Sequence, residues 1–386
     1  MISHPLSSAT TRRRFVGSLA AAAGAIFIPP WTALATQVAE APKSSGAGPR
    51  KLGVALLGLG GYASGQLAPA LQETTRCRLA AVVTGTPAKA ERWQKKYDLA
   101  ASCLYNYENF DRIADNPAVD VVYVVTPNAL HRDFVIRAAK AGKHVICEKP
   151  MATTVQDCDA MILACQEAKR KLSIGYRLHF EPYNLEIARL GTTRELGAVK
   201  RIQAEDAFPS SGGTWRFDPK LAGGGALMDV GIYCVQAACY ATGEEPIGIT
   251  ARMEPKTDPA RFREIEETLD WTMEFPSGAR AECMTSYNKV GNRLRVEMAG
   301  GWAELAPAYS YRGIHGRTSR GKMDFPQVNQ QARQMDAFAQ CIVEDQPNLV
   351  PGEMGRRDVR ILEAIYEAAR TGRRVELTAG ESPKPV

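Results

Sequence analysis

The stretch 54–71, VALLGLGGYASGQLAPAL, constrains the fold more than any other part of the chain, because an apolar run leads into a glycine cluster and then into a helical pattern. The same order of apolar run and amphipathic segment repeats along residues 52–176. Continuous apolar runs such as VDVVYVV need cover on both faces, so the alternation predicts a parallel, doubly wound sheet. We expect strands at 52–58, 79–84, 120–125, 143–147 and 172–176, with helices near 62–73, 86–97, 128–141 and 153–171.

The glycine cluster falls where the first strand is expected to turn into the first helix. Residues without bulky side chains let the backbone approach a pyrophosphate, and a helix N-terminus supplies free amides and a positive dipole end. Such a triplet alone also fits a simple tight turn, but its place after a strand, before a helix and at the head of a repeating unit is a strong signal for a dinucleotide. The predicted contacts in this turn are Gly58, Gly60, Gly61, Tyr62 and Ala63.

The segment after the expected second strand indicates which dinucleotide is bound. An NAD site places Asp or Glu there to accept the ribose hydroxyls, whereas this chain has VVTGTPAKAER, without a carboxylate at that point. Thr84, Gly85 and Thr86 offer hydroxyls and amides, and Lys89 adds positive charge, so a 2′-phosphate is accommodated. The segment favours NADP. The alternative is that Thr before Pro only caps a helix.

Two further stretches lie at the carboxyl ends of expected strands, where open parallel sheets bind ligands: TPNALH at 126–131 and CEKPMAT at 147–153. A lysine between Glu and Pro at such a place can position a sugar hydroxyl beside a nicotinamide ring and ease the loss of its proton. The alternative is an exposed loop lysine paired with Glu148. The cofactor contacts predicted in these stretches are Thr126, Pro127, Asn128, His131, Glu148 and Lys149.

Length and composition exclude several classes of protein. A chain of 386 residues favours two domains. The net charge of +6 includes Arg12, Arg13 and Arg14, and no basic cluster is interleaved with stacking aromatics, so we expect no nucleic-acid partner. Nine cysteines without a Cys-x-x-Cys spacing do not form a disulfide framework, and we predict no metal site.

The N-terminus has the order of features of an export signal. Residues 11–15, TRRRF, fit the twin-arginine pattern, an apolar run follows from 16 to 28, and ALA at 33–35 is a cleavage site. The run is too short for a lasting transmembrane helix, so we expect no stable membrane anchor. We therefore predict a signal peptide at 1–35, a flexible arm at 36–50 and export of the folded protein to the periplasm, against the alternative of a disordered basic tail.

Six motifs in order carry a resemblance to a known family: GLGGYA, TPNALH, AGKHVICEKPMAT, IGYRLHFEPYN, LAGGGALMDVGIYCVQ and GEMGRRDVRILEAIYEAARTGR. The chain resembles the glucose-fructose oxidoreductase and inositol dehydrogenase superfamily, and within it the periplasmic glucose-fructose and aldose-aldose oxidoreductases. The resemblance implies an α/β fold, with a Rossmann domain at 51–176 and an α+β domain with an open, mostly antiparallel sheet at 177–350. Residues 351–386 are then a C-terminal helix and tail, and helices near 327–345 and 353–371 pack back on the first domain.

The motif GGGALMDVGIY at 223–233 completes the expected active site. Asp229 and Tyr233 are four residues apart and share one face of a helix. Asp229 can hold a sugar hydroxyl, and Tyr233 can act as the acid/base. A free tyrosine hydroxyl titrates near pH 10, so this role calls for a positive neighbour such as Lys149, and the alternative is a helix cap with a buried aromatic. The resemblance adds Arg177, Trp215 and Arg216 as cofactor contacts and Arg177, His179 and Tyr183 as substrate contacts.

The export signal shapes the expected mechanism. An exported dehydrogenase lacks a pool of free NADP, so the cofactor must stay tightly bound and be recycled in place. This predicts a ping-pong cycle that oxidises an aldose to its lactone and then reduces a second sugar, aldose or ketose, to an alditol. In the glucose-fructose enzymes an arm crosses the cofactor, which the resemblance extends to residues 36–50. The segment AFPSSGGTW is shorter than its counterpart in those enzymes and favours a broad aldose specificity.

Three further hypotheses stay open from the sequence. Relatives with this fold and export signal include NAD-dependent glycosidases, although these prefer an acidic residue after the second strand and a His-bearing signature in the second domain, and this chain has neither. The second hypothesis is a dehydrogenase that uses soluble NADP, and the third is a non-catalytic sensor. The resemblance also implies a homo-oligomer, either a dimer or a tetramer, because the open sheet face is usually buried between copies in this family.

Overall fold

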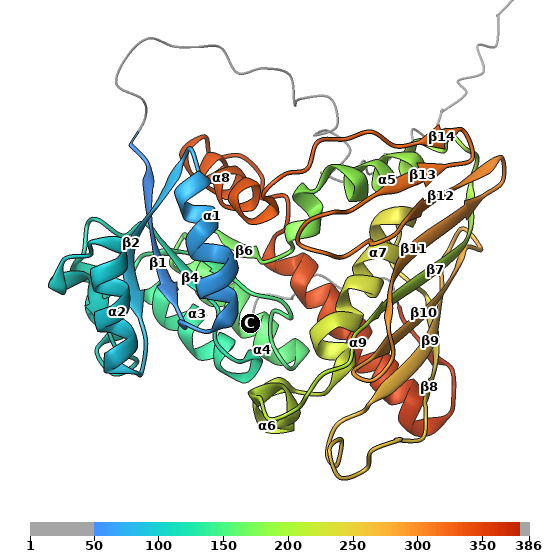
Figure 1. Ribbon diagram of the computed structural model, residues 1–386, viewed down its shortest axis with the longest axis horizontal. Helices are drawn as coiled ribbons and strands as arrows, with labels where there is room; N and C mark the ends of the chain where they lie inside the picture. Colours follow the sequence, from blue (N-terminus) through green and yellow to red (C-terminus); the bar gives the residue numbers. More distant parts are fainter. Residues whose placement is uncertain (1–49, 379–386) are drawn as a thin grey trace, which may run out of the picture.

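The computed structural model describes residues 50–378. The predicted signal peptide, almost all of the predicted arm and the last eight residues of the tail lie outside the described residues. Two sheets organise the described chain, one of six strands and one of nine, and Figure 1 shows them side by side with helices between and around them.

The first sheet is the predicted doubly wound one. Every strand pair in it is parallel, in the order β3-β2-β1-β4-β5-β6, so the direction of winding reverses between β1 and β4. The five predicted strands are confirmed to within two residues at each end, and β3 is a two-residue edge strand that the sequence pattern did not predict. The strands are β1 (Leu52–Leu57), β2 (Cys77–Val83), β3 (Leu104–Tyr105), β4 (Val121–Val124), β5 (His144–Cys147) and β6 (Leu172–Ile174).

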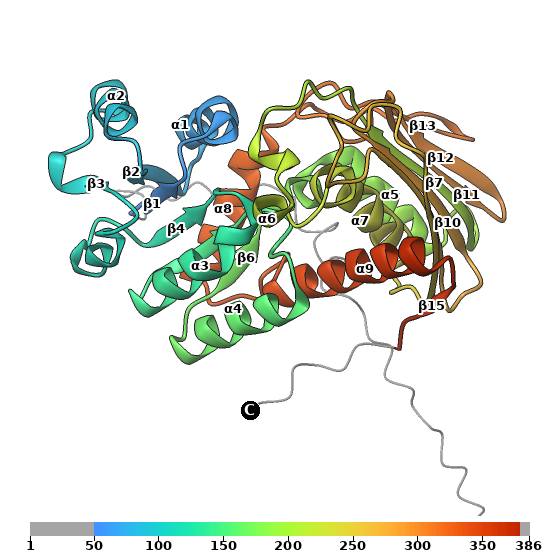
Figure 2. The same ribbon diagram turned by 90° about the horizontal axis from the view of Figure 1, so that it is seen from below.

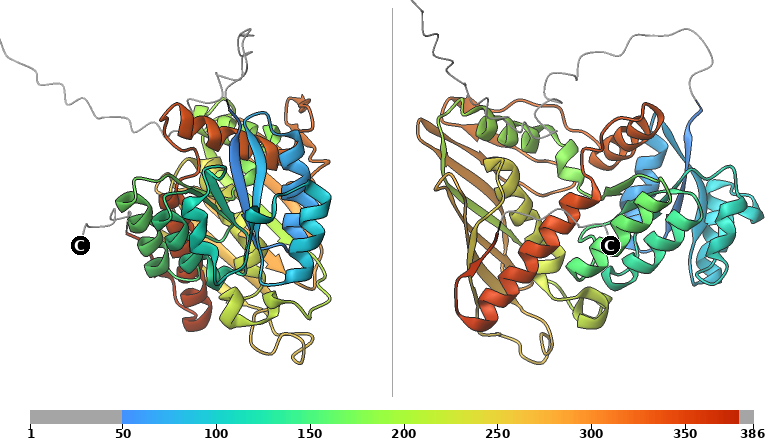
Figure 3. Two further views of the ribbon diagram at one scale, coloured as in Figure 1. Left: turned by 90° about the vertical axis from the view of Figure 1, so that its left-hand side faces the viewer. Right: turned by 180° about the vertical axis from the view of Figure 1, so that it is seen from behind.

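Helices cover both faces of this sheet, as Figure 3 shows from the side. The first helix begins with a π-helical turn, η2 (Ala63–Leu67), and continues as α1 (Ala68–Glu73); α2 (Pro87–Tyr97) packs on the same face. On the other face lie α3 (His131–Lys140) and α4 (Val155–Glu167). Helix α4 ends earlier than predicted because Lys169, at φ 54°, turns the chain through the left-handed region toward β6.

The second sheet is open and mostly antiparallel, as expected. Its order is β14-β13-β12-β11-β7-β10-β9-β8-β15, and among the described strands of this sheet the pair of β7 and β10 alone is parallel. The strands are β7 (Val199–Ala207), β8 (Gly248–Met253), β9 (Thr268–Glu274), β10 (Arg280–Ser286), β11 (Gly291–Met298), β12 (Gly301–Leu305), β13 (Gly316–Thr318), β14 (Gly321–Lys322) and β15 (Val375–Glu376).

One face of the second sheet is covered by α5 (Pro182–Thr193) and α7 (Ile232–Thr242). Every residue from 232 to 241 is buried, so α7 is the central helix of this domain. The stretch Pro219–Thr242, which also contains the short helix α6 (Pro219–Ala222), is long and apolar enough to cross a membrane by length and composition, and 78% of its most apolar window is buried inside the protein. Its apolar character is therefore explained by the core.

The last two helices join the domains. Helix α8 (Gln330–Val343) packs on α1 and β2, and the Asp336 carboxylate accepts hydrogen bonds of 2.8 Å from the backbone amides of Thr75 and Arg76. Helix α9 (Gly352–Thr371) lies against α4 and β6 at one end and β8 at the other, as Figure 2 shows. The prediction that these helices pack back on the first domain is confirmed, and α9 contacts both sheets.

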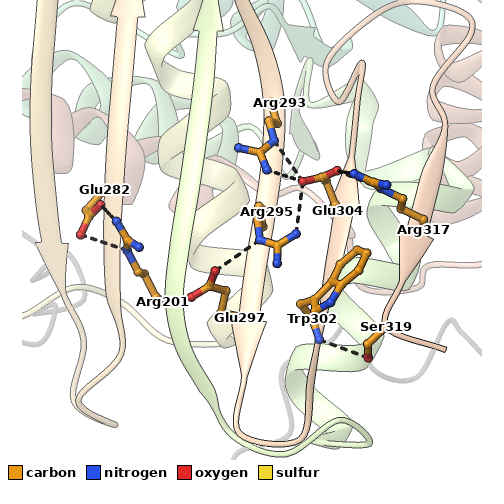
Figure 4. Close-up of polar contacts among 9 residues, drawn as sticks. All are labelled: Arg201, Glu282, Arg293, Arg295, Glu297, Trp302, Glu304, Arg317 and Ser319. Atoms are coloured by element: carbon orange, nitrogen blue, oxygen red, sulfur yellow. Dashed lines mark hydrogen bonds and ion pairs between the residues drawn. The ribbon is translucent and has the colours of Figure 1, made fainter. Parts of the chain in front are cut away.

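The outer face of the second sheet is covered by ion pairs (Figure 4). The side chain of Glu304 on β12 is only 5% exposed and lies among three arginines, with Arg293 Nε 3.1 Å, Arg317 Nη2 2.7 Å and Arg295 Nη1 3.4 Å from its carboxylate. Burial acts to raise the pKa of Glu304, but hydrogen bonds from Arg317 and Arg293 lower it to about 2. One face of an antiparallel sheet can be exposed to water, as here. The sequence-based expectation of a homo-oligomer, which would bury this face between copies, stays a prediction.

Glu304→Gln should lower the free energy of unfolding by about 2 kcal/mol at pH 7, because it leaves three guanidinium groups around a neutral side chain. Glu282→Gln, which removes the exposed partner of Arg201, should cost less than about 0.5 kcal/mol. A carboxyl with a lowered pKa stabilises the fold above its unfolded pKa of about 4.3, and this contribution is lost as the pH falls toward 2. Urea titrations from pH 7 to pH 3 measure the free energy of unfolding of wild type and of both variants. The difference between wild type and Glu304→Gln should shrink as the pH falls, and a difference that grows would contradict this account.

Candidate active site

The turn after β1 has the shape that a dinucleotide requires. Gly58 has a φ of 101°, and a Cβ there would lie 2.7 Å from the carbonyl oxygen of Val125, so only glycine fits. Gly60 and Gly61 are exposed, and a Cβ on either would meet no heavy atom within 4 Å. Ala63 is fully buried at the start of the helix. The turn therefore leaves open space at a helix N-terminus, where a pyrophosphate can approach the backbone.

The end of β2 can accept a 2′-phosphate. Gly85 and Thr86 are exposed, Lys89 is half-buried, and residues 84–89 contain no carboxylate. Thr86 occupies the N-cap position of α2, but its side chain accepts no hydrogen bond from the helix, so its hydroxyl is free to meet a ligand. The Thr84 hydroxyl, by contrast, is buried and accepts a hydrogen bond of 3.3 Å from the Thr86 amide. This arrangement fits NADP better than a simple helix cap.

The loops after β4 and β5 are joined by a buried histidine. The His131 ring is fully buried, with Nε2 2.9 Å from the carbonyl oxygen of Thr126 and Nδ1 3.0 Å from that of Pro150. Burial lowers the pKa of His131. The predicted contact between His131 and the cofactor is contradicted, because the ring joins the two loops and reaches no open space. Asn128 is also buried, and its amide donates to the carbonyl of Ala222 at 2.8 Å.

The other predicted contacts in these loops lie at different depths. The Thr126 hydroxyl is buried without a hydrogen-bond partner among the described residues, and Pro127 is half-buried beside it. Glu148 lies deeper, where its carboxylate accepts a 2.7 Å hydrogen bond from Tyr123 and burial raises its pKa. A Cβ on Gly175 would lie 2.5 Å from this carboxylate, so glycine there makes the room that Glu148 occupies.

The structure brings Lys149, Asp229 and Tyr233 together across the two domains. Lys149 lies directly after β5, Asp229 in the π-helical turn η8 (Leu227–Gly231) and Tyr233 at the start of α7. The Lys149 ammonium donates to the backbone carbonyl of Asp229, lies 3.5 Å from its carboxylate and is 4.7 Å from the centre of the Tyr233 ring. Three residues that the sequence placed in separate motifs thus form one cluster at the carboxyl edge of the first sheet.

Neighbouring groups fix the charges in this cluster. The Asp229 carboxylate accepts hydrogen bonds from Arg216 Nε at 2.9 Å and the Tyr287 hydroxyl at 3.0 Å. Burial acts to raise the pKa of Asp229, but Lys149 and Arg216 hold it below its ordinary value. Burial acts to lower the pKa of Lys149, whereas Tyr233 and Asp229 raise it overall. Asp229 is therefore an anion and Lys149 a cation at neutral pH, and Trp215 stacks on the Arg216 guanidinium at 4.6 Å.

Three residues predicted to contact the sugar or the cofactor are buried and contact other protein groups instead. Arg177 is 2% exposed, and its guanidinium donates to backbone carbonyls of residues 309 and 310. Tyr183 is 3% exposed, and its hydroxyl donates to the carbonyl of Phe325 at 3.0 Å. His179 lies edge-on to the Tyr240 ring, and burial lowers its pKa to about 3. Tyr183 is thus a core residue and not the predicted substrate contact, and Arg177 acts through the segment that it anchors.

Asp206 on β7 is a residue of the site that the sequence motifs did not predict. It is the only acidic residue on an inward-facing position of the RIQAEDAF pattern, which was the available signal. The side chain is 7% exposed, and its carboxyl forms no hydrogen bond to any described residue. Burial raises the pKa of Asp206 to about 8, against the opposing effects of Arg177 and Lys149. Tyr287 and Tyr311, which also lie at the site, stand in segments without any recognisable motif.

Asp206→Asn should stabilise the protein increasingly as the pH rises. The unfolded state loses the Asp206 proton near pH 4, whereas the folded state keeps it to about pH 8, so this carboxyl costs stability progressively across that window. The variant should gain roughly 2–4 kcal/mol more at pH 8 than at pH 5, from about 1.4 kcal/mol per pKa unit. Urea titrations at pH 5 and pH 8 measure the free energy of unfolding of the variant and of wild type. Glu205→Gln, which removes a neighbouring carboxylate, is the matched control. An advantage that shrinks with rising pH would refute the assignment.

Comparisons with known proteins agree with this geometry. Residues 52–176 match the model of the oxidoreductase family with an NAD-binding Rossmann fold, and residues 185–304 match the GFO/IDH/MocA C-terminal domain. The crystal structure of aldose-aldose oxidoreductase from Caulobacter crescentus complexed with glycerol is 46% identical, with a TM-score of 0.82 over 85% of this chain and 100% of that chain.

Two curated relatives span most of the chain. D-xylose 1-dehydrogenase [NADP(+)] of Haloarcula marismortui is 28% identical over 340 residues, which cover 84% of this chain and 92% of the relative. D-glucoside 3-dehydrogenase of Escherichia coli K12 is 26% identical over 352 residues, which cover 84% and 97%. The names of these relatives refer to sugars, and the first also refers to NADP(+).

Proposed function

Because this chain belongs to the GFO/IDH/MocA oxidoreductase family, we propose that it is a sugar oxidoreductase that keeps NADP bound and passes electrons from one sugar to another. The observation that carries the proposal is the cluster of Lys149, Asp229 and Tyr233 at the carboxyl edge of the first sheet, where open sheets of this kind bind their ligands. The likeness to an aldose-aldose oxidoreductase at 46% identity supports a sugar on both sides of the reaction.

The residues present fit NADP at three places. The exposed turn at Gly60 and Gly61 would hold the pyrophosphate, and the carboxylate-free segment 84–89 would hold the 2′-phosphate. The Thr126 hydroxyl just after β4, which has no hydrogen-bond partner among the described residues, is a third group that the cofactor could engage. When bound, NADP supplies an acceptor and donor of hydride. The NADP(+) in the name of the xylose relative supports this choice of cofactor.

The side chains of the cluster account for the proton. As an aldose loses hydride from C1, Tyr233 takes the proton of the C1 hydroxyl, and the sugar leaves as a lactone. As a second sugar gains hydride at its carbonyl carbon, Tyr233 returns the proton to the carbonyl oxygen, and the product is an alditol. Lys149 orients the reacting oxygen as a donor, and the anionic Asp229 holds a neighbouring hydroxyl. One pocket therefore serves both half-reactions.

Recycling of the bound cofactor follows from the proposed export. We propose that the TRRRF motif directs the folded protein to the twin-arginine export machinery and so to the periplasm. Free NADP is scarce there, and a cofactor that stays bound and is reduced and reoxidised by alternating sugars removes the need for a pool. An aldose acceptor is favoured over fructose alone because the AFPSSGGTW segment is short.

Tyr233→Phe should lower kcat at least 100-fold, because general acid–base catalysis contributes about 10²–10⁴-fold, while the bound nucleotide content stays unchanged. Purified protein is incubated with glucose and a second aldose, and lactone and alditol are quantified. Nucleotide is released by denaturation and identified by mass. A wild-type protein that is free of nucleotide and turns over only with added NADP would show a dehydrogenase that uses soluble cofactor.

The same assay separates the remaining hypotheses. Free sugar released from an aryl glycoside would indicate a glycosidase. A 3-keto product would indicate oxidation at C3, which the D-glucoside 3-dehydrogenase relative brings into consideration. Absence of any product from a nucleotide-loaded protein would indicate a non-catalytic sensor.

Replacing Arg12 and Arg13 together by Lys should keep the protein in the cytoplasm, because the twin-arginine machinery reads both guanidinium groups. Cell fractionation followed by immunoblotting measures the distribution. Arg14→Lys, one residue beyond the pair, is the matched control and should still be exported. Periplasmic protein in the doubly substituted variant would contradict the proposed route.

A further inference from the structure

Two tyrosines from different domains meet beside the active site. Tyr62 follows Gly60 and Gly61 in the turn after β1, and Tyr311 lies between β12 and β13 of the second sheet. Their ring centres are 5.8 Å apart with the planes tilted by 34°, a geometry within the range of favourable aromatic pairs. The pair thus connects the turn after β1 in the first domain to the segment between β12 and β13 in the second domain.

The segment that carries Tyr311 is held by buried side chains. Arg177 donates to the carbonyl oxygens of Tyr309 at 2.6 Å and Ser310 at 3.2 Å. Gln330 donates to the carbonyl oxygens of Ser310 at 3.0 Å and Tyr311 at 3.2 Å. Arg177 comes directly after the first domain, and Gln330 begins α8, which packs on α1 and β2. Tyr311 is therefore held in place against the first domain.

Tyr62 reaches from the glycine turn toward the catalytic cluster. Burial raises the pKa of the Tyr62 hydroxyl, and the nearby Glu148 and Tyr233 raise it further. The Arg177 guanidinium lies 4.9 Å from the Tyr233 ring centre and 4.4 Å from that of Tyr311. A dinucleotide that extends from the exposed glycine amides to Lys149 must therefore run beside Tyr62, with Tyr311 next to it and 41% exposed at the edge of the site.

We propose that Tyr62 and Tyr311 form an aromatic clasp that slows release of the bound dinucleotide, an inference that rests on the proposed NADP-dependent function. The two rings join the domains beside the Arg177 guanidinium, which also lies against the Tyr233 ring. Departure of the cofactor then requires the rings to separate. The hydrogen bonds from Arg177 and Gln330 oppose movement of the Tyr311 segment, because they must break before the segment can move aside. The clasp acts on retention of the cofactor, whereas Lys149, Asp229 and Tyr233 act on the reaction.

The test measures the dissociation rate of NADPH from the full-length protein, by the loss of its fluorescence signal during displacement with excess NADP. Tyr62→Ala and Tyr311→Ala should each release NADPH about 5–20-fold faster. The double variant should be no more than about twofold faster than the faster single variant, because both substitutions break the same contact. Tyr62→Phe and Tyr311→Phe keep the rings and should stay within about twofold of wild type. Tyr97→Ala, which breaks an aromatic pair with Trp93 on α2, is the matched control.

A second variant guards against misfolding of the alanine variants. Gln330→Ala removes the two hydrogen bonds from Gln330 to the carbonyl oxygens of Ser310 and Tyr311 while keeping both rings, and it should accelerate release in the same direction by about 2–5-fold. Thermal melting confirms that each variant is folded. Rates that multiply in the double variant would mean that each ring contacts the nucleotide independently, and unchanged rates would mean that neither retains it; either result overturns the clasp.

The outcome for the clasp is distinct from that for the proposed function. A wild-type protein that is purified without nucleotide, yet binds added NADPH, contradicts recycling of a bound cofactor, and the dissociation rates of the variants still decide on the clasp. A wild-type protein that does not bind NADPH at all overturns both. Retained nucleotide with equal release rates in all variants supports the function and overturns the clasp alone.

Discussion

The contact of Lys149 with Asp229 is the interaction on which the site depends, because it joins the end of β5 in one domain to the start of α7 in the other. The two side chains are 11% and 15% exposed, so each loses most of its hydration. A buried ion pair of this kind adds little net stability, since the cost of desolvation offsets most of the attraction. Its value lies in position: it brings Tyr233, one helical turn after Asp229, against the lysine.

The carboxyl group of Asp229 in this pair and those of two neighbours have different pKa values because their surroundings differ. Asp229 has two cations and a tyrosine hydroxyl as partners, which hold its pKa low. Glu148 has a tyrosine hydroxyl but lies deep in the protein, and burial raises its pKa. Asp206 has no hydrogen-bond partner among the described residues, and its pKa rises to about 8. The site therefore holds one anion and at least one carboxyl, that of Asp206, which stays mostly protonated at neutral pH and can donate a hydrogen bond.

The sequence predicted what is encoded in local patterns and missed what arises from distant contacts. Apolar periodicity located the parallel strands, and the spacing of Asp229 and Tyr233 placed both correctly beside Lys149. His131 looked like a ligand contact because it stands in a motif at a strand end, yet its role depends on Pro150, nineteen residues away. Tyr311 had no local signal, because its position depends on anchors more than a hundred residues earlier in the chain and on α8.

The way the domains are joined favours a site that stays assembled between half-reactions. Helix α8 packs on the first sheet while its first residue holds the Tyr311 segment, and α9 contacts both sheets. Opening the site by a domain movement would break these contacts together, and under the proposed function this favours exchange of the small sugar over exchange of the dinucleotide. A site whose side chains keep their positions suits the proposed reaction, in which one sugar leaves and another enters while the cofactor stays bound. The same contacts that position Lys149 against Tyr233 thus also fit the proposed retention of NADP.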